Sequence, residues 1–237
     1  MIENKFNFLN SATVTQFLIK NAEVKYAEFT KKLVPDTNYK ILGIKVPLLK
    51  CIAKYIAKNS ILMQEYLSTN HIYYEEWFIH GLVLGYSKLP IEDLLIKITQ
   101  FLPYIDNWAI CDSVVANLKI FKKNSDVSYS FACSLLSSQF PYVIRFAIIM
   151  FLDYNICELF IDKILLKLSK LKNDNYYVEM AISWFLSVSA IKFNEKIYNL
   201  LENRKFCKFI TNKTISKISD SYRFNQQDKI KFNKLKI

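Results

Sequence analysis

The chain has 237 residues, of which 52% are hydrophobic and 22% charged, so it is long enough for a sizeable core and too apolar to be disordered. Only three glycines and five prolines are present, which disfavours the many turns of an all-β or dinucleotide-binding fold and favours helices. The net charge of +11 predicts a polyanionic partner, most simply a nucleic acid, although a lysine-rich composition alone would also produce it.

The sequence shows no secretory signal pattern and no apolar run of membrane-spanning length. The two histidines and five cysteines have no spacing typical of a metal site. We therefore expect a cytoplasmic protein without metal, cofactor or membrane contact. Its cysteines, which lie in apolar helical patterns, are expected to be reduced core residues: Cys51, Cys111, Cys133, Cys157 and Cys207.

Apolar spacing and stop signals predict helices along the whole chain. In chain order they are Ala12–Asn21, Val24–Leu33, Leu48–Lys58, Tyr73–Tyr86, one opened by Pro90, one capped by Asp106, one beginning near Asn124, Tyr142–Asn155, Glu158–Leu171, Tyr176–Ile191, Glu195–Asn203, Lys213–Ser221 and a short final helix. No strand and no linker between domains is predicted. Paired helices at this spacing predict a single all-α domain over residues 1–237, a solenoid of HEAT-like repeats with a concave binding face. A solenoid with capped ends is usually monomeric, so we expect a monomer.

Four of the predicted helices carry a pattern that recurs about every 31 to 37 residues. Counted from the start of each stretch, the fourth residue is Trp77, Trp108, Arg145 or Met180, and the eighth is Gly81, Asp112, Ile149 or Trp184. Residues four apart share one face of a helix. Equivalent faces of stacked repeats align, so the pattern predicts one surface with three tryptophans, an arginine and a carboxylate.

The carboxylate of Asp112 is the residue of this pattern with the clearest chemical use. It takes a position expected to face the array, where an acid is costly unless it is paired. Arg145 of the following repeat is the expected partner. A half-buried carboxylate beside aromatic rings can stabilise positive charge that develops on a substrate. The alternative is that Trp108 belongs to the core and Asp112 is an ordinary surface acid.

These residues resemble those of the DNA alkylation repair glycosylases of the AlkD type, which are built from HEAT-like repeats. The resemblance covers nearly the whole chain, and the motifs that carry it are KILGIKVPLLKCIAK, YYEEWFIHG, IDNWAICD, VIRFAIIM, MAISWFLS and TNKTISKISDSYR. Each motif is weak alone, but their order and spacing are specific. The resemblance implies a monofunctional DNA glycosylase that removes cationic N3- or N7-alkylated purines from double-stranded DNA.

The resemblance also implies roles for four residues. Asp112 would be the catalytic carboxylate, and Arg145 would hold a DNA phosphate and orient that acid. Trp108 and Trp184 would contact the deoxyribose and the backbone at the lesion. Because an alkylated purine is already cationic and leaves as a neutral base, the absence of a histidine acid is no obstacle to this chemistry.

Further DNA contacts are predicted near the two ends of the array. Phosphate binding suits three residues close to the C-terminus, Lys213, Lys217 and Arg223, for which the alternative is an ordinary solvated face. Tyr26, Lys31 and Lys32 belong to a helix expected near the mouth of the groove, and this helix could equally be an amphipathic cap. Glu75 and Glu76 point about 100° apart on a helix, so we interpret them as structural rather than as a catalytic pair.

Two other functions stay open at this point. A non-catalytic paralogue would bind branched or damaged DNA on the same scaffold, and the insertion-like segment PDTNYKILG, which departs from the active type, favours it. A protein-binding HEAT scaffold would use Trp and Arg as interface anchors. With six phosphate contacts, DNA affinity would fall about a thousandfold between 50 and 200 mM salt. Such a fall would exclude the protein-binding scaffold.

Overall fold

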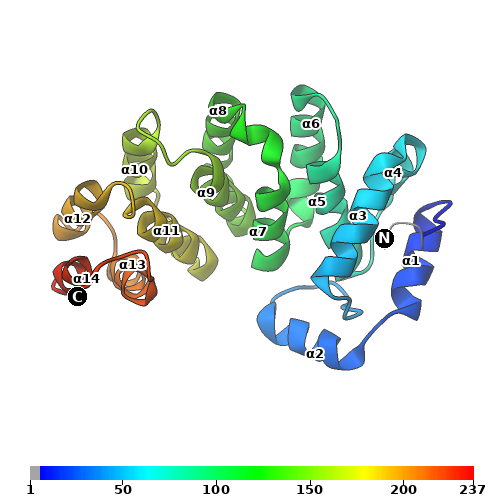
Figure 1. The fold of residues 1–237 in the computed structure, drawn as a ribbon, viewed down its shortest axis with the longest axis horizontal. Helices are drawn as coiled ribbons and strands as arrows, with labels where there is room; N and C mark the ends of the chain where they lie inside the picture. Colours follow the sequence, from blue (N-terminus) through cyan, green and yellow to red (C-terminus); the bar gives the residue numbers. More distant parts are fainter. Residues whose placement is uncertain (1–5) are drawn as a thin grey trace. The chain divides into compact units, whose positions relative to one another are not determined.

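The computed structural model describes residues 6–237 and contains fourteen α-helices in this range (Figure 1). The described residues form no strand, only an isolated bridge between Lys40 and Tyr73. The predicted all-α class is therefore confirmed. Residues 1–5, which belong to the segment searched for a signal pattern, lie outside the described part. No helix in the described part is long and apolar enough to cross a membrane.

The helices divide into two compact units, Met1–Ile120 and Phe121–Ile237, and each is described by itself. The N-terminal unit contains α1 (Ser11–Lys20), α2 (Val24–Leu33), α3 (Val46–Lys58), α4 (Ser60–Ser68), α5 (Tyr74–Tyr86), α6 (Ile91–Phe101), the 3-10 helix η2 (Leu102–Tyr104) and α7 (Trp108–Asn117). After η3 (Lys119–Lys122), the C-terminal unit contains α8 (Ser125–Leu135), α9 (Pro141–Tyr154), α10 (Ile161–Lys170), α11 (Tyr176–Ser189), α12 (Asn194–Glu202), α13 (Lys208–Asp220) and α14 (Gln226–Asn233). The prediction of one repeat domain with a concave face stays a prediction.

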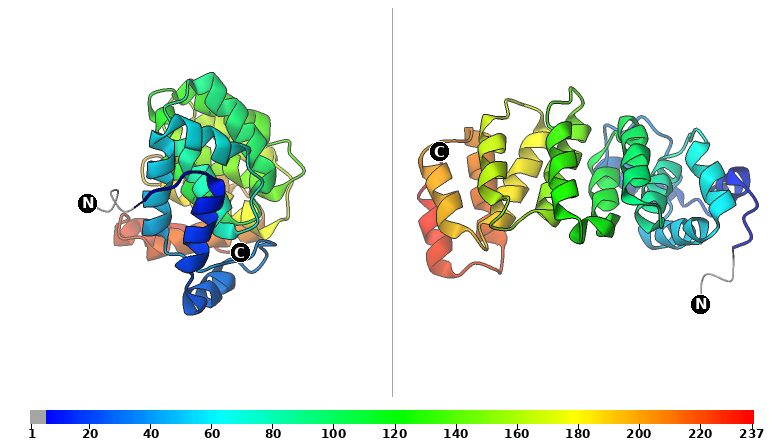
Figure 2. Two further views of the ribbon diagram at one scale, coloured as in Figure 1. Left: turned by 90° about the vertical axis from the view of Figure 1, so that its right-hand side faces the viewer. Right: turned by 90° about the horizontal axis from the view of Figure 1, so that it is seen from above.

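In the N-terminal unit α3, α5 and α7 pack in sequence, with α4 against α3 and α5, and α6 against α5 (Figure 2). The central helix α5 is buried along almost its whole length, from Tyr74 to Leu84. Gly81 is required where α5 approaches its neighbours, because a Cβ there would collide with Cγ2 of Val114 and lie 2.9 Å from Cζ of Phe101. This close approach explains why the smallest residue occupies the eighth position of the first repeat.

The C-terminal unit has the same kind of packing, with α9 between α8 and α11, and α13 between α11 and α14. Side chains from Val143 to Phe151 of α9 are all buried. Beyond α13 the basic tail is folded rather than simply solvated, since Phe224, Phe232 and Leu235 are buried. Successive stacking of equivalent helices within each unit is the packing expected of helical repeats.

Several details differ from the predictions. The helix α4 was not predicted, and α13 begins at Lys208 rather than Lys213. The expected core position of the cysteines is confirmed for Cys111, which is buried, and wrong for Cys207, which is exposed at the start of α13. The other three, Cys51, Cys133 and Cys157, are half-buried, and none of the five forms a disulfide within the described residues. The expected surface with three tryptophans is also wrong, because Trp77 is only 2% exposed and its ring stacks on that of Tyr104 at 4.0 Å.

The structural interpretation of the two glutamates of α5 is supported by their contacts. Glu75 accepts hydrogen bonds from the backbone N–H groups of Leu42, Gly43 and Ile44 at 2.7–3.2 Å. Glu76 accepts from the N–H groups just before α5 and from the hydroxyl of Thr15. The two carboxylates therefore fix the end of the connector and the start of α5. Gly43 has a φ of 87°, which favours glycine at this turn.

A pair of buried histidines lies beside Trp77 in this core. Nε2 of His71 is 3.1 Å from Nδ1 of His80, and the two residues are 5% and 7% exposed. Burial lowers the pKa of His71 to about 4, although Glu76 partly opposes the shift. Burial, His71 and Lys97 lower the pKa of His80 to about 3. Both rings are therefore neutral in the folded protein at neutral pH.

The sign of the pH dependence follows from these pKa values. In the unfolded chain each histidine binds a proton as the pH falls below about 6.5. The folded protein binds these protons only near pH 4 and below, so the free energy of unfolding decreases as the pH falls from about 6.5 towards 4. Above pH 6.5 or so the pair makes no pH-dependent contribution.

We predict that neither histidine ring titrates above about pH 5 in the folded protein. Because the chain contains only two histidines, the ring proton signals in an NMR titration of untagged protein report this pair alone. The same signals measured in concentrated urea provide the control and should titrate near the ordinary pKa of about 6.5. A folded-state ring that titrates near that value would contradict the buried neutral pair.

Candidate nucleic-acid interface

The helix α7 presents Trp108 and Asp112 one turn apart, as the repeat pattern predicted. Asn107, rather than the predicted Asp106, caps α7, because its Oδ1 accepts a hydrogen bond from the N–H of Ile110 at 3.0 Å. Ile110 and Val114 fill the core on the opposite side of the helix. Trp108 and Asp112 are both half-buried, so an indole and a carboxylate share a partly exposed face.

The indole of Trp108 is held by the end of α2. Its Nε1–H donates to the backbone oxygen of Leu33, the last residue of α2, at 2.8 Å. This bond satisfies a carbonyl at the C-terminus of α2 and restricts the rotation of the indole ring. The position of Trp108 therefore depends on where α2 ends.

Asp106 anchors the connector that follows α2. Its carboxylate accepts hydrogen bonds from the hydroxyl of Thr37 and the N–H of Asn38 at 2.8–2.9 Å, and from the side-chain amide of Asn107 at 2.8 Å. Charge-assisted bonds of this kind are stronger than neutral ones. The two residues before α7 therefore have separate tasks, Asn107 capping the helix and Asp106 binding residues 37–38.

The helix α2 exposes apolar side chains as well as basic ones. Thr30 is its only buried residue, while Val24, Phe29 and Leu33 are 73%, 52% and 44% exposed. The ring of Tyr26 lies 5.8 Å from that of Phe29. A cap packed through an apolar face would bury these residues, so this arrangement favours the alternative in which α2 contacts a partner.

The two predicted lysines of α2 differ in their surroundings. The Nζ of Lys31 donates to the backbone oxygens of Pro35 and Thr37 at 3.2 and 3.0 Å. Lys31 therefore also stabilises the connector. Lys32 is exposed.

In the C-terminal unit Arg145 is a buried cation that joins α9 to α11. It is 6% exposed, and its Nη1 donates to the backbone oxygen of Tyr177 at 2.8 Å. Four residues later Ile149 is fully buried, whereas Trp184, at the equivalent position of α11, is half-buried. The eighth position of the repeat is therefore not uniformly a surface position.

Trp184 lines a cavity of about 660 Å³ together with two of the predicted phosphate-binding residues, Lys217 and Arg223. Leu152 and Val188 contribute apolar walls, and Tyr222, 90% exposed, also lines it. We call this the Trp184 cavity. The contribution of Tyr222 was missed in the sequence, because helical periodicity does not determine side-chain directions in the turn after α13.

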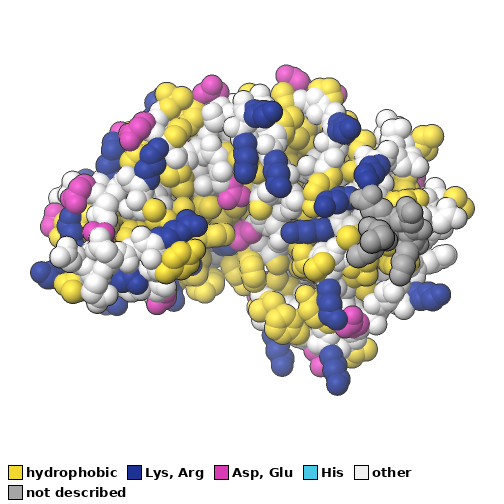
Figure 3. Space-filling view, in the orientation of Figure 1, with side chains coloured by type: hydrophobic (Ala, Val, Ile, Leu, Met, Phe, Trp, Pro, Cys, Tyr) yellow, Lys and Arg dark blue, Asp and Glu magenta, His cyan; other side chains and the backbone are white. Residues whose placement is uncertain are grey.

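The cations around Lys217 repel one another. Burial lowers the pKa of Lys217, and the nearby charges of Arg145 and Lys213 lower it further. On the face of the molecule that Figure 3 shows, lysine and arginine side chains lie on both units. The Trp184 cavity itself is lined by two cations, Lys217 and Arg223, and by Asp220, which partly opposes the fall in the pKa of Lys217. An anion such as a phosphate would stabilise the two cations.

The structure brings Trp184, Lys217 and Arg223 together at one cavity, and it ties Trp108 to α2. The predicted pairing of Asp112 with Arg145 would join the two units and stays a prediction. Within the described residues, no three His, Cys, Asp or Glu side chains lie close enough to hold a metal ion.

Comparison with protein families identifies the chain. Residues 14–218 match the model of the family described as DNA alkylation repair enzyme. The chain belongs to the DNA alkylation repair enzyme family. The matched residues include Trp108, Asp112, Arg145 and Trp184 and end before Arg223, so the resemblance noted in the sequence is confirmed at the level of the family. A comparison with curated proteins finds no match.

Substitution of Lys217 should affect stability and DNA binding in opposite directions. We predict that Lys217→Met raises the melting temperature of the free protein, because it removes a half-buried cation that Arg145 and Lys213 repel. The same change should weaken DNA binding and reduce the salt-dependence slope of log K by about one, as expected for one lost phosphate contact. Thermal unfolding and fluorescence anisotropy at several salt concentrations measure the two effects.

The matched control is Lys167→Met, which removes the same charge from an exposed position on α10. It should leave the salt slope unchanged. Equal salt slopes for Lys217→Met and the control would contradict a phosphate-binding role for Lys217. A lower melting temperature of Lys217→Met would contradict the repulsion by Arg145 and Lys213.

Proposed function

We propose that the protein is a DNA glycosylase that hydrolyses the N-glycosidic bond of N3- or N7-alkylated purines in double-stranded DNA. Membership of the DNA alkylation repair enzyme family supports DNA as the substrate. The observation that carries the finer proposal is on α7. There a half-buried carboxylate, Asp112, follows by one turn an indole whose ring is held by the oxygen of Leu33.

The reaction that suits these groups needs a negative charge to stabilise the sugar, and it needs no acid to protonate the leaving base. An N3- or N7-alkylated purine carries positive charge, and the electron pair of the breaking C1′–N9 bond neutralises it, so the base leaves without being protonated. The deoxyribose becomes oxocarbenium-like at the same moment. A carboxylate nearby stabilises that charge, and such preorganised electrostatic stabilisation is often the largest single contribution to catalysis. Water then adds to C1′ and loses a proton, giving an abasic sugar.

The indoles have a complementary part in this proposal. The face of an indole attracts cationic centres with about 0.5–2 kcal/mol, depending on desolvation. Trp108 and Trp184 would contact the deoxyribose on which charge develops. Because the Nε1–H of Trp108 is already bonded to Leu33, its ring is oriented before DNA binds, which lowers the cost of organising the site.

The cations would position the DNA backbone. In this proposal Lys213, Lys217 and Arg223 bind phosphates, while the buried Arg145 orients Asp112 and contributes to phosphate binding. Lys32, Lys31 and Tyr26 of α2 would contact the duplex near the lesion. No cofactor is needed for this hydrolysis. We further propose a monomeric protein acting in the cytoplasm.

The proposal is tested by base release from methylated double-stranded DNA. We predict that Asp112→Asn lowers the single-turnover rate of 7-methylguanine or 3-methyladenine release by about a hundredfold or more, the usual cost of removing one preorganised charge-stabilising group. The change preserves the size of the side chain and removes only its charge. DNA affinity, measured by anisotropy on an unmodified duplex, should not fall, because the change adds no negative charge.

Asp93→Asn provides a control with the same charge change at an exposed position of α6. It should release bases at the wild-type rate. Equal rates for Asp112→Asn and wild type would remove Asp112 from the mechanism. Binding of DNA by the wild type without base release would instead support the non-catalytic paralogue.

A further inference from the structure

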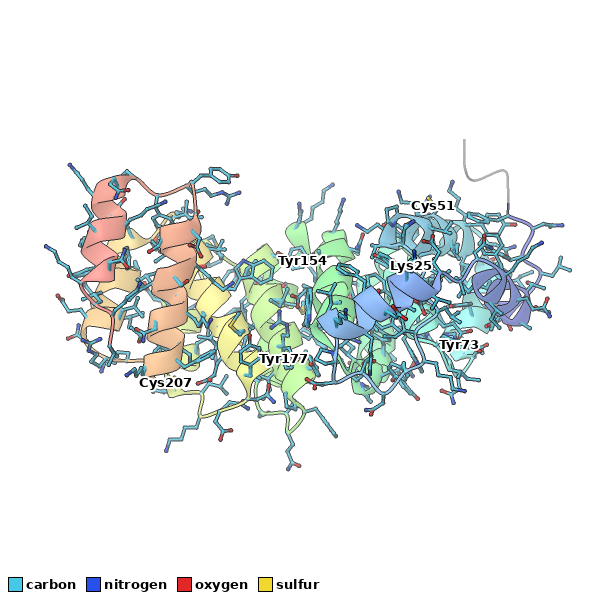
Figure 4. All side chains as sticks on the ribbon, turned by 90° about the horizontal axis from the view of Figure 1, so that it is seen from below. Lys25, Cys51, Tyr73, Tyr154, Tyr177 and Cys207 are labelled. Atoms are coloured by element: carbon cyan, nitrogen blue, oxygen red, sulfur yellow. The ribbon has the colours of Figure 1, made fainter. Side chains whose placement is uncertain are left out.

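A second cavity of the C-terminal unit, separate from the Trp184 cavity, opens beside the first half of α13. It has a volume of about 650 Å³, and we call it the Phe209 cavity. The residues that line it are Lys208, Phe209, Asn212, Lys213, Ser216 and Lys236. Figure 4 shows α13 with Cys207 labelled at the end where the helix begins.

One face of α13 forms the wall of this cavity. Phe209, Lys213 and Ser216 lie three or four residues apart and so project from the same face. The opposite face is buried through Ile210, Thr214 and Ile218. The lining residues of α13 are thus attached to a helix fixed in the core, and this wall of the cavity is preformed.

The other side of the cavity is held by the end of the chain. Asn212 and Ile237 exchange two hydrogen bonds, from Nδ2 to the backbone oxygen at 2.9 Å and from the backbone N–H to Oδ1 at 3.0 Å. Nη1 of Arg204 also donates to the backbone oxygen of Leu235 at 2.8 Å. These three bonds flank Lys236 and hold its backbone beside α13.

Phe209, the aromatic residue of the lining, pairs with the ring of Tyr176 next to it. The rings of Phe209 and Tyr176 meet edge to face, with their centroids 5.8 Å apart. Tyr176 is 52% exposed, and Nζ of Lys213 lies 5.9 Å from the centroid of Phe209. Flat aromatic rings beside lysines are the surface on which the bases of single-stranded nucleic acids stack.

The charge of the lining distinguishes this cavity from others in the unit. Its lining residues include three lysines and neither aspartate nor glutamate. The Trp184 cavity includes Asp220, and the neighbouring cavities along α10 include Asp162, Asp174 and Glu179. The side chains that line the Phe209 cavity therefore combine three lysines with an aromatic ring, which suits a phosphate that carries a base.

We infer that the Phe209 cavity binds an unpaired nucleotide of a DNA strand, with its base against Phe209 and Tyr176 and its phosphates near Lys208, Lys213 and Lys236. The volume lies within the range of about 300–1,000 Å³ typical of sites for single small molecules, which suits one nucleotide and not a duplex. The inference rests on the proposed function only for DNA as the ligand.

Continuity along α13 supports a DNA strand rather than an isolated nucleotide. Lys213 lines the Phe209 cavity, and Lys217, one turn further along the helix, lines the Trp184 cavity. The two charges also interact. Burial and the charge of Arg145 are the larger causes of the lowered pKa of Lys217, and the charge of Lys213 lowers it further. A strand whose phosphates bind Lys217 can therefore continue along α13 to place an unpaired nucleotide in the Phe209 cavity.

The test compares single-stranded and double-stranded ligands by fluorescence anisotropy. Wild-type protein is titrated into a labelled thymidylate strand of about ten nucleotides, within the site sizes known for single-strand binders. Phe209→Leu should weaken binding of this strand by about fivefold to a hundredfold, because one base-stacking contact contributes about 1–3 kcal/mol. Binding of a blunt duplex should be unchanged.

Two further variants separate stacking from charge and from folding. Phe140→Leu changes an exposed phenylalanine before α9 and should bind the strand like wild type. Lys208→Gln combined with Lys236→Gln leaves the aromatic pair intact and should reduce the single-strand salt slope by about 1.4, at about 0.7 per phosphate. Circular dichroism and thermal unfolding show whether Phe209→Leu retains the fold.

The inference is overturned if wild type does not bind the thymidylate strand, as expected if the cavity instead docks an acidic peptide. It is also overturned if wild type and Phe209→Leu bind the strand equally while the lysine variant keeps the wild-type slope. Base release from a blunt methylated duplex should be the same in Phe209→Leu and wild type. The wild type could bind the thymidylate strand more tightly than Phe209→Leu does and yet release no base from the methylated duplex. That result would overturn the glycosylase proposal and leave this inference standing.

Discussion

The carboxylate of Asp106 is the interaction on which the candidate site of the N-terminal unit depends. It binds the hydroxyl of Thr37 and the N–H of Asn38, and so fixes the connector that follows α2. With the connector fixed, the end of α2 is in place for its Leu33 oxygen to accept the indole N–H of Trp108. Two of these links use a backbone group, the N–H of Asn38 and the oxygen of Leu33, that would otherwise lack a partner in a loop or at a helix end. The orientation of the indole beside Asp112 is therefore set by contacts outside α7.

Helix positions were predictable where the local signal was strong. The bounds of α2 agree with the prediction, because Pro35 prevents a helix from continuing and the apolar spacing begins at Val24. The helix α4 was missed because only Asn59 separates it from α3, so one residue ends one helix and caps the next. The cap of α7 was misassigned for a different reason. Asp106 and Asn107 are both good capping residues, and only the tertiary contacts of Asp106 with residues 37–38 decide between them.

The sequence predicted which residues belong to the repeat pattern, but it did not predict which of them are exposed. Trp77 and Trp108 occupy the same position of the repeat, yet Trp77 is buried under Tyr104 of η2 while Trp108 is half-buried against Leu33. A period derived from sequence treats these positions as equivalent. The difference comes from η2, a single turn after α6 that follows no repeat pattern. Periodicity therefore identifies which helix face matters, and the irregular segments between helices decide which members of that face reach solvent.

In the C-terminal unit one helix, α13, brings lysines to two adjacent cavities. Residues 210, 214 and 218 bury one side of α13, which fixes the helix in the core. Its other residues serve two adjacent cavities, with Lys217 at one and Phe209 and Lys208 at the other. Lys217 is partly desolvated among other cations in the free protein. A phosphate bound at the Trp184 cavity would be attracted by Lys217 and Arg223, and it would offset the repulsion from Arg145 and Lys213 that Asp220 only partly opposes.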